Sequence, residues 1–353
     1  MSIKFSYRRR IAMCLLLACC RHSAQPAQAQ EASVAQPYMA PLFLNPAYSG
    51  MEGVMRLGAT CQYRWGQIDH PYMLYAAYAD YYFAAFGSGV GLCALSERQG
   101  GGALTQTSLG ASYAYNLRIA ERTFLRFGIQ ALLDVTAVNA AKLTFPDMLG
   151  AYGGAAPAGS AYAPSQRSDF DMATGIVFSH RIFYVGAALH NLLEAPAGEV
   201  AGQLIATPRK LALHGGCNIA IPLYGRRYSY YRGSSTALML SPNVICGVQG
   251  AAQAVALGGY IGMKGFSGGF FYKANSRSKA VFYSICAAYS SSLFSLAYSF
   301  DFGTVSKAMP QSSPDVHEVS LSFKIRQPTR SSYFQNRRNS SPKIQNTPYI
   351  NYL

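Results

Sequence analysis

Residues 125–134 of the chain read LRFGIQALLD, and every second residue from Leu125 to Leu133 is apolar. The residues between them, Arg126, Gly128 and Gln130 first among them, are mostly polar or small. Because successive side chains of a strand point to opposite faces, this stretch predicts a β-strand with one apolar face. About ten alternating residues is also the length with which a tilted strand crosses a lipid bilayer.

The same alternation recurs along the chain and is broken each time by turn residues. The predicted strands are 53–65, 70–83, 88–97, 104–118, 123–137, 169–179, 181–190, 209–221, 236–248, 252–262, 265–273, 279–289, 292–302 and 317–325. The two strands within 236–262 are the weakest, because Pro242 interrupts the first of them. The count of about fourteen fits the even strand numbers of bacterial outer-membrane barrels.

Composition supports a membrane location. Half of the 353 residues are hydrophobic and only 13% are charged, whereas soluble domains carry about 25% charged residues. After Ala29 no apolar run approaches the roughly 20 residues of a membrane helix, so a closed barrel is the remaining way to satisfy the backbone in lipid. We therefore predict an all-β, antiparallel transmembrane β-barrel in the cell outer membrane, with outer-membrane lipids around it.

The first 29 residues predict export. A basic segment with Arg8, Arg9 and Arg10 precedes the apolar run 11–20, and the A-x-A site Ala27-Gln28-Ala29 follows. This order is typical of a cleaved signal peptide, which is excluded from the fold. A second interpretation stays open: Leu16-Leu17-Ala18-Cys19 has the pattern of a lipobox, which would make Cys19 a lipidated first residue.

The predicted domains follow from these segments: a signal peptide at 1–29, a periplasmic N-terminal segment at 30–52, the barrel at 53–326, and a basic tail at 327–353. An even strand count places both chain ends on the same, periplasmic side. The polar composition of the tail favours disorder. The longest predicted link, 138–168, is of the kind that is usually extracellular.

The sequence contains no convincing catalytic or metal-ligating pattern. His190-Asn191 suggests a comparison with outer-membrane phospholipases, but Leu192 stands where such an enzyme would need a serine, and no carboxylate pair can be assembled. We therefore predict no enzyme activity, cofactor or metal. Nucleic-acid binding is not expected either, because the chain is exported and its basic residues are not interleaved with stacking aromatics. Five cysteines remain after the leader, and we interpret them as small apolar fillers of strands: Cys61, Cys93, Cys217, Cys246 and Cys286.

Asp301 ends a run of small residues in a predicted strand. It is expected either as a plain lumenal residue at a strand end or as the partner of a lumenal arginine such as Arg64.

Several segments, in order, resemble the PorP/SprF family of the type IX secretion system. They are LNPAYSG at 44–50, YRWGQI at 63–68, ASYAYNLRI at 111–119, LRFGIQALL at 125–133, DFDMATGIVF at 169–178, FYVGAALHNLLEAP at 183–196, TPRKLALHGG at 207–216, LAYSFDFGTVS at 296–306 and HEVSLSFKI at 317–325. The direct Arg64-Trp65 step departs slightly from the family's Arg-x-x-Trp or Arg-Gln-Trp strand end. The positions that carry the resemblance are Asn45, Pro46, Arg64, Trp65, His190, Asn191, Leu192, Pro208, Arg209, Lys210, Asp301, His317 and Glu318.

The resemblance implies a non-enzymatic outer-membrane component that supports secretion or surface attachment of cargo proteins, including gliding adhesins in some members. It also implies contact with periplasmic type IX secretion components and with the C-terminal domain of a secreted cargo protein. The alternative function is an outer-membrane channel or small-solute transporter, which length and strand count suit as well.

Overall fold

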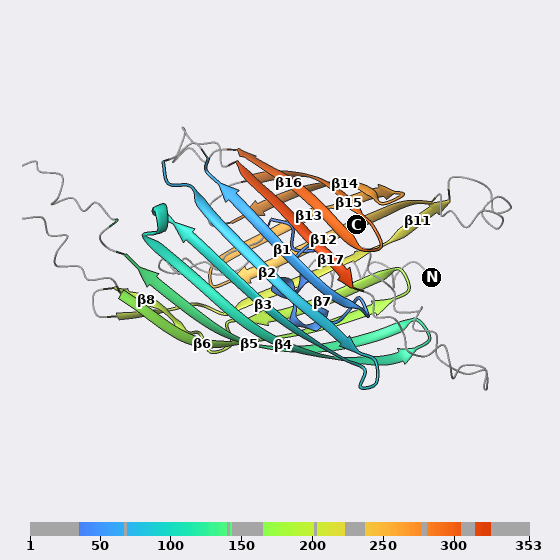
Figure 1. Cartoon of the computed structure of the whole chain (residues 1–353), viewed down its shortest axis with the longest axis horizontal. Coiled ribbons are helices and arrows are strands. Elements are labelled where there is room, and N and C mark those ends of the chain that lie inside the picture. The colour runs from blue at the N-terminus through green and yellow to red at the C-terminus, as the bar shows by residue number, and fades with distance from the viewer. Residues whose placement is uncertain are drawn as a thin grey trace, which may run out of the picture.

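The computed structural model describes residues 35–66, 69–139, 142, 165–200, 203–222, 237–276, 281–304 and 315–325. Strands dominate this part of the chain, and all of their pairings are antiparallel (Figure 1). The strands are β1 (Met55–Arg64), β2 (Tyr72–Phe83), β3 (Ser88–Gln99), β4 (Leu104–Ala120), β5 (Thr123–Val138), β6 (Ser165–His180), β7 (Phe183–His190), β8 (Pro196–Val200), β9 (Gln203–Ala206), β10 (Lys210–Cys217), β11 (Ile219–Pro222), β12 (Ala237–Gln249), β13 (Ala252–Met263), β14 (Phe266–Asn275), β15 (Val281–Ser290), β16 (Phe294–Thr304) and β17 (Val316–Ile325).

The sheet closes on itself because β1 pairs with β17, from Met55 opposite Ile325 to Arg64 opposite Val316. β10 and β11 both pair with β12 and are separated only by Asn218, so together they form one strand of the wall. The wall is therefore a closed barrel of 14 strands, as predicted. β1 begins and β17 ends at one edge of the barrel, which we call the terminal rim, and the other edge is the opposite rim.

The predicted alternation decides which side chains line the lumen. In β5, Phe127 and Ile129 are 45% and 55% exposed on the outer wall, whereas Arg126 and Gln130 are 2% and 3% exposed inside. β17 follows the same rule, with Val319 and Phe323 outside and Glu318 and Ser320 buried. An apolar outer wall faces lipid, and the polar side chains point inward, as an outer-membrane barrel requires.

Two features of the strands differ from the prediction. β6 begins at Ser165, four residues before the expected start at 169. The reason is that its polar residues 165–168 pair with β5 as far as Val138. β8 and β9 form a separate hairpin, within residues 196–206 where no strand was predicted. In both places the backbone pairs as a strand, but apolar and polar residues do not alternate as they do in a membrane strand. These residues were not predicted as strand because that alternation was the signal used to find strands.

Pro242 occupies a place in β12 that tolerates a missing N–H group. It keeps its register with Gly259 of β13, but on the other side it faces the gap between β10 and β11, where no pairing partner is assigned. Proline in a sheet is confined to such breaks in the hydrogen-bond ladder.

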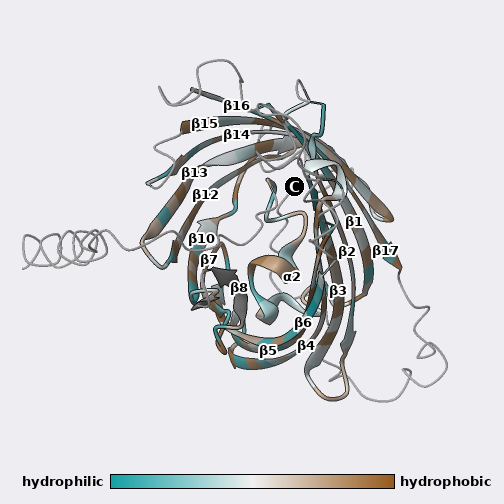
Figure 2. Cartoon of the chain, turned by 90° about the vertical axis from the view of Figure 1, so that its left-hand side faces the viewer, coloured by the Kyte–Doolittle hydropathy of each residue, from teal (hydrophilic) through white to brown (hydrophobic). Residues whose placement is uncertain are grey.

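Residues 35–54, which we call the lumen plug, lie inside the barrel. They contain the helix α2 (Pro41–Leu44) and the short 3-10 helix η1 (Pro46–Tyr48), and Figure 2, which looks along the barrel, shows α2 within the ring of strands. Leu42, Ala47 and Tyr48 are completely buried. The sequence predicted a periplasmic N-terminal segment at 30–52, and the described part of that segment, residues 35–52, lies within the lumen.

Further predictions concern the cysteines, membrane helices and the two ends of the chain. The five cysteines, in strands β1, β3, β10, β12 and β15, form no disulfide with one another, and Cys93 and Cys286 are buried. In the ranges the structure describes, no helix is long and apolar enough to cross a bilayer. The leader at 1–29, Cys19 and the tail at 327–353 lie outside the described residues.

Candidate functional site

Asn45 fixes the centre of the lumen plug. Its side-chain oxygen accepts a hydrogen bond from the Ala47 N–H at 2.9 Å and so caps η1, whose first residue is Pro46. Its amide nitrogen lies 3.2 Å from the carbonyl oxygen of Ile176 in β6 and 3.0 Å from that of Ala187 in β7. One side chain therefore shapes the turn and ties it to the wall.

His214 of the wall strand β10 contacts the same turn with its side chain. Its Nε2 lies 3.1 Å from Asn45 Nδ2, and its Nδ1 lies 3.1 Å from the Tyr48 hydroxyl. Since Asn45 Nδ2 can only donate, His214 Nε2 is the acceptor. Nδ1 then carries the proton and donates to Tyr48 when the ring is neutral. The imidazole thus bridges two residues of the plug.

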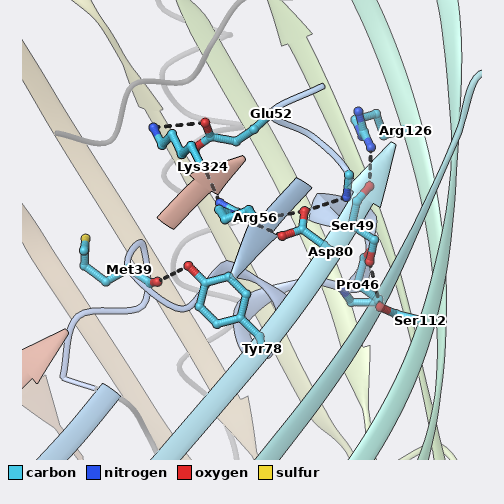
Figure 3. A network of polar contacts seen from close by, with 11 residues as sticks. Met39, Pro46, Ser49, Glu52, Arg56, Tyr78, Asp80, Ser112, Arg126 and Lys324 are labelled. Atoms are coloured by element: carbon cyan, nitrogen blue, oxygen red, sulfur yellow. Dashed lines mark hydrogen bonds and ion pairs between the residues drawn. The ribbon is translucent and has the colours of Figure 1, made fainter. Parts of the chain in front are cut away.

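Arg126 of β5 holds the plug two residues further along. Its Nε and a terminal nitrogen donate to the carbonyl oxygens of Ala47 and Ser49, at 2.9 and 2.6 Å. The Ser49 hydroxyl lies 2.7 Å from that of Ser112 in β4 (Figure 3). Arg126 is almost fully buried, so these charge-assisted hydrogen bonds are protected from water.

The wall has no side chains where the plug touches it most closely. A Cβ on Gly128 of β5 would collide with the backbone nitrogen of Ala47, and one on Gly175 of β6 would collide with Asn45 Oδ1. Gly89 of β3 makes equally close contact with the plug at Ser49. These glycines let the backbone of the plug lie directly on the sheet. This explains why the lumen-facing positions of the wall strands are rich in small residues.

An ion pair fastens the end of the plug beside β1. Asp80 of β2 accepts hydrogen bonds from Arg56 at 2.8 and 3.2 Å and from the Gly50 N–H at 2.8 Å (Figure 3). Glu52 lies 3.6 Å from Arg56 and 3.0 Å from Lys324 of β17. Gly50 has φ +67°, and a Cβ there would meet the backbone of Gly89, so this position favours glycine.

The first described residues are held by Glu318 of β17. Its two carboxylate oxygens accept hydrogen bonds from the N–H groups of Ala35 and Gln36, at 2.6 and 2.8 Å. Gln62 of β1 also donates to this carboxylate at 2.7 Å, and Lys273 of β14 donates to the Ala35 carbonyl oxygen at 2.8 Å. Burial raises the pKa of Tyr38, three residues further on, so its hydroxyl stays protonated.

A cavity of about 320 Å³ lies between the plug and the opposite rim. Ala35, Tyr38 and Leu44 of the plug line it on one side. Its other sides are mainly apolar residues of the wall strands, together with the charged residues Arg64, Lys210, Lys273 and Asp301. The lumen therefore consists of a filled part and an open vestibule.

Some of the motif positions that are distant in sequence meet at the opposite rim. His190 is paired with Lys210 across β7 and β10, and its Nε2 lies 3.3 Å from the Leu44 carbonyl oxygen. Leu192 accepts a hydrogen bond from Arg209 at 3.3 Å through its carbonyl oxygen. Asn191, at φ +57°, donates to the Pro208 carbonyl oxygen at 3.5 Å. Residues 190–192 and 208–210 therefore lie on either side of the β8–β9 hairpin and are joined to each other where it leaves the barrel wall.

The remaining motif positions are dispersed. Asp301 does meet a lumenal cation, but that cation is Lys273 at 2.7 Å, whereas Arg64 donates to Gln62 and stacks 4.9 Å over Tyr72. The suggested Arg64–Asp301 pair is therefore replaced by a Lys273–Asp301 pair.

Trp65 and His317 lie away from the lumen. Trp65 is 42% exposed at the opposite rim, with φ +59°. His317 is exposed on the outer wall, where it contacts Tyr298.

Sequence reasoning missed the wall residues that hold the plug: Arg56, Asp80, Arg126, His214, Lys273 and the lumenal glycines. The alternation pattern could have pointed to them, because each occupies a lumen-facing position of its strand, where a charged side chain needs a buried partner. The identity of the partner required the three-dimensional structure. Among the described residues no cluster of histidine, cysteine and acidic side chains could hold a metal ion.

The chain is similar to several solved structures. They include the Acinetobacter baumannii outer membrane protein Omp33 (11% identity, TM-score 0.43, covering 78% of this chain and all of that one). A mutant of the monoaromatic hydrocarbon channel TodX is 9% identical, with a TM-score of 0.46, and covers 80% of this chain and 93% of that one. A Pseudomonas aeruginosa FadL homologue is 12% identical, with a TM-score of 0.41, and covers 81% and 94%.

No curated protein sequence matches the chain. The model of the type IX secretion system membrane protein PorP/SprF family matches residues 27–323. This match includes the whole lumen plug and all wall strands except the last two residues of β17. The chain therefore belongs to the PorP/SprF family of type IX secretion system membrane proteins.

Proposed function

We propose that this protein is a non-enzymatic outer-membrane component of the type IX secretion system that supports secretion or surface attachment of cargo proteins, gliding adhesins among them. The observation that carries the proposal is the lumen plug, which fills part of the lumen. Its residues 35–54 are tied to β2, β5, β6, β7 and β17 by hydrogen bonds. A barrel plugged by its own chain suits a protein that holds partners better than one that conducts solutes.

The proposed orientation places the terminal rim in the periplasm. All links at this rim are short, between two and four residues, except that between β11 and β12, and the links at the opposite rim include the longest, between β5 and β6. Short turns are typical of the periplasmic side and long loops of the cell surface. Periplasmic secretion components would then contact the terminal rim, and the C-terminal domain of a cargo protein would contact the opposite rim.

Deleting the gene tests the proposal. We expect a defined set of proteins to disappear from the cell surface and the medium and to be restored by the wild-type gene. Comparative mass spectrometry of surface, medium and periplasmic fractions measures this. If every type IX cargo still reached the surface in the deletion strain, the proposed function would be wrong.

A channel or transporter is the competing function, and the vestibule is the feature that favours it. Recording the purified protein in planar bilayers separates the two. We expect negligible conductance from the intact chain, and robust conductance or solute flux would favour transport instead.

A further inference from the structure

One edge of β6 is open where the strand begins, at the opposite rim. β5 pairs with the whole of β6, from Ser165 to His180, whereas β7 pairs with β6 only from Thr174 onward. The hairpin β8–β9, which follows β7 along the chain, pairs only with itself. Within the part of the chain that the structure describes, no strand pairs with residues 165–170 on the β7 side, and we call this side the open edge.

The residues after β7 end its pairing with β6. Asn191 has φ +57°, a left-handed conformation that interrupts an extended strand. The Leu192 N–H still donates to the Met172 carbonyl oxygen at 3.1 Å. Asp171 Oδ1 then accepts hydrogen bonds from the N–H groups of Met172 and Leu193, at 2.6 and 3.0 Å. The ladder is closed at this point, and the open edge starts with the residue before Asp171.

Three residues direct their main-chain hydrogen-bonding groups toward the open edge. In an antiparallel sheet the N–H and C=O groups of every second residue point to the same neighbouring strand. Because Met172 bonds toward the β7 side, Phe170, Ser168 and Gln166 point the same way. All three are exposed, and none has a backbone partner on that side among the described residues. Such a row of donors and acceptors is a template for one more strand.

The open edge lies beyond the lipid. Residues 165–169 read SQRSD and are polar on both faces, and Arg167 and Asp169 form an ion pair with each other at 2.9 Å. Phe170 is 53% exposed on the outer wall beside Leu133 of β5, which is 44% exposed, so it marks the boundary of the apolar band. An added strand would therefore place an apolar side chain beside Phe170 and polar side chains further from the membrane.

The tilt of the strands disfavours a second copy of this chain at the open edge. Two copies inserted in the same direction would be related by a two-fold axis along the membrane normal. Barrel strands are tilted by about 35–45°, so the two β6 edges would cross at about twice that angle instead of running side by side. A water-soluble partner has no such restriction, because it can align a strand with β6 in any orientation.

We propose that the open edge of β6 binds an extended segment of a secreted protein, which adds to the sheet as a strand beside Gln166, Ser168 and Phe170. Main-chain hydrogen bonds would hold this segment, and an apolar side chain beside Phe170 would fix its register. The inference rests on the proposed function, whose orientation places this rim at the cell surface. It names the surface that a cargo protein would contact.

A proline in the open edge tests this inference in the full mature protein. Ser168→Pro removes one N–H group from the open edge and spares the ladder with β5, toward which Ser168 directs no main-chain group. Ser168→Ala keeps the N–H group and is the matched control. The probe is a labelled peptide, Thr-Val-Thr-Tyr-Thr-Val-Thr, whose fluorescence anisotropy is measured with the protein in lipid nanodiscs. We expect saturable binding to the wild type and to Ser168→Ala, and at least tenfold weaker binding to Ser168→Pro.

Hydrogen exchange shows where the peptide binds. Mass spectrometry should find slower amide exchange in residues 165–170 when the peptide is present. Gln166→Pro, with Gln166→Ala as its control, repeats the test nearer the end of the strand, so the result does not depend on one variant. No binding to the wild type, equal binding to the proline and alanine variants, or protection elsewhere in the barrel would overturn the proposal. A wild-type dimer that Ser168→Pro dissociates would assign the edge to a second copy and would equally overturn it.

The deletion strain separates this inference from the proposed function. The wild-type gene and Ser168→Ala should restore cargo to the cell surface, and Ser168→Pro should restore at least several-fold less at an equal amount of barrel in the outer membrane. Full restoration by Ser168→Pro would reject the strand addition and leave the role in secretion intact. Unchanged surface cargo in the deletion strain itself would instead reject the proposed function.

Discussion

Single residues of this barrel act through contacts between the lumen plug and the wall, and glycine is the clearest case. Gly128 leaves space for the Ala47 backbone, whereas a Cβ on Gly247 of β12 would meet nothing within 4 Å. Both glycines lie inside wall strands, so glycine weakens the strand for the same intrinsic reasons at both positions. The difference between them isolates the contact with the plug.

Gly128→Ala is expected to destabilise the protein by about 1–3 kcal/mol, because the plug or the strand must move to accommodate the methyl group. Gly247→Ala should change the free energy of unfolding by less than about 0.5 kcal/mol. Urea unfolding of the refolded barrels in detergent, followed by tryptophan fluorescence and electrophoretic mobility, measures both. Equal effects of the two substitutions would show that the close approach at Gly128 is unimportant.

The Arg56–Asp80 ion pair gives a second test at this scale. Asp80→Ala leaves Arg56 buried without its main partner and removes the acceptor of the Gly50 N–H, so we expect a loss of about 3–5 kcal/mol. Glu194→Ala breaks the exposed Glu194–Arg209 pair and should cost less than about 1 kcal/mol. Denaturant midpoints of the two variants provide the comparison, and a similar shift in both would contradict the assigned role of burial.

At the scale of elements, the lumen plug behaves as an inserted segment that the wall does not need for its own pairing. The fourteen wall strands pair with each other through their backbones, and closure by β1 and β17 involves no residue of the plug. The plug is held by side chains of the wall and by its fit against glycines. Wall and plug are therefore separable in principle.

Deleting residues 35–53 should leave a folded barrel and open its lumen. We expect a large rise in single-channel conductance in planar bilayers compared with the intact chain, because the polar inner wall would become hydrated. Gly247→Ala, which leaves the plug in place, serves as the control and should conduct as little as the wild type. A folded deletion variant with unchanged conductance would mean that something other than the plug closes the lumen.

Two neighbouring hairpins of the whole molecule test its orientation in the membrane. The turn 250–251 between β12 and β13 lies at the opposite rim, and the turn 264–265 between β13 and β14 lies at the terminal rim. Both are two-residue turns of the same sheet, so they are equivalent sites for a short epitope tag.

With the terminal rim in the periplasm, antibody should label intact cells that carry a tag at 250–251. Cells with a tag at 264–265 should be labelled only after the outer membrane is permeabilised. Flow cytometry before and after permeabilisation measures this difference. The reverse pattern would invert the proposed orientation and would exchange the rims assigned to periplasmic partners and to cargo.

The sequence by itself determined the barrel. Alternation with a period of two is a local property, because each residue's face follows from its position in a strand, and so segments such as 125–134 predicted both the strands and the lumenal phase that the structure confirms. The ordered family segments were equally readable, since they depend on residue identity alone. The β8–β9 hairpin escaped because it does not alternate as a membrane strand does.

Only the tertiary structure decided what fills the barrel. The segment LNPAYSG carried part of the family resemblance, but its place in the lumen depends on wall residues. These are Gly128, Gly175, Arg126 and His214, which come from three different wall strands. In the same way, Asp301 was recognised as lumenal, yet its partner is Lys273, because the register of β14, β15 and β16 brings these two side chains together. The physical reason is that partner choice depends on distances across a closed sheet, and no local pattern encodes these distances.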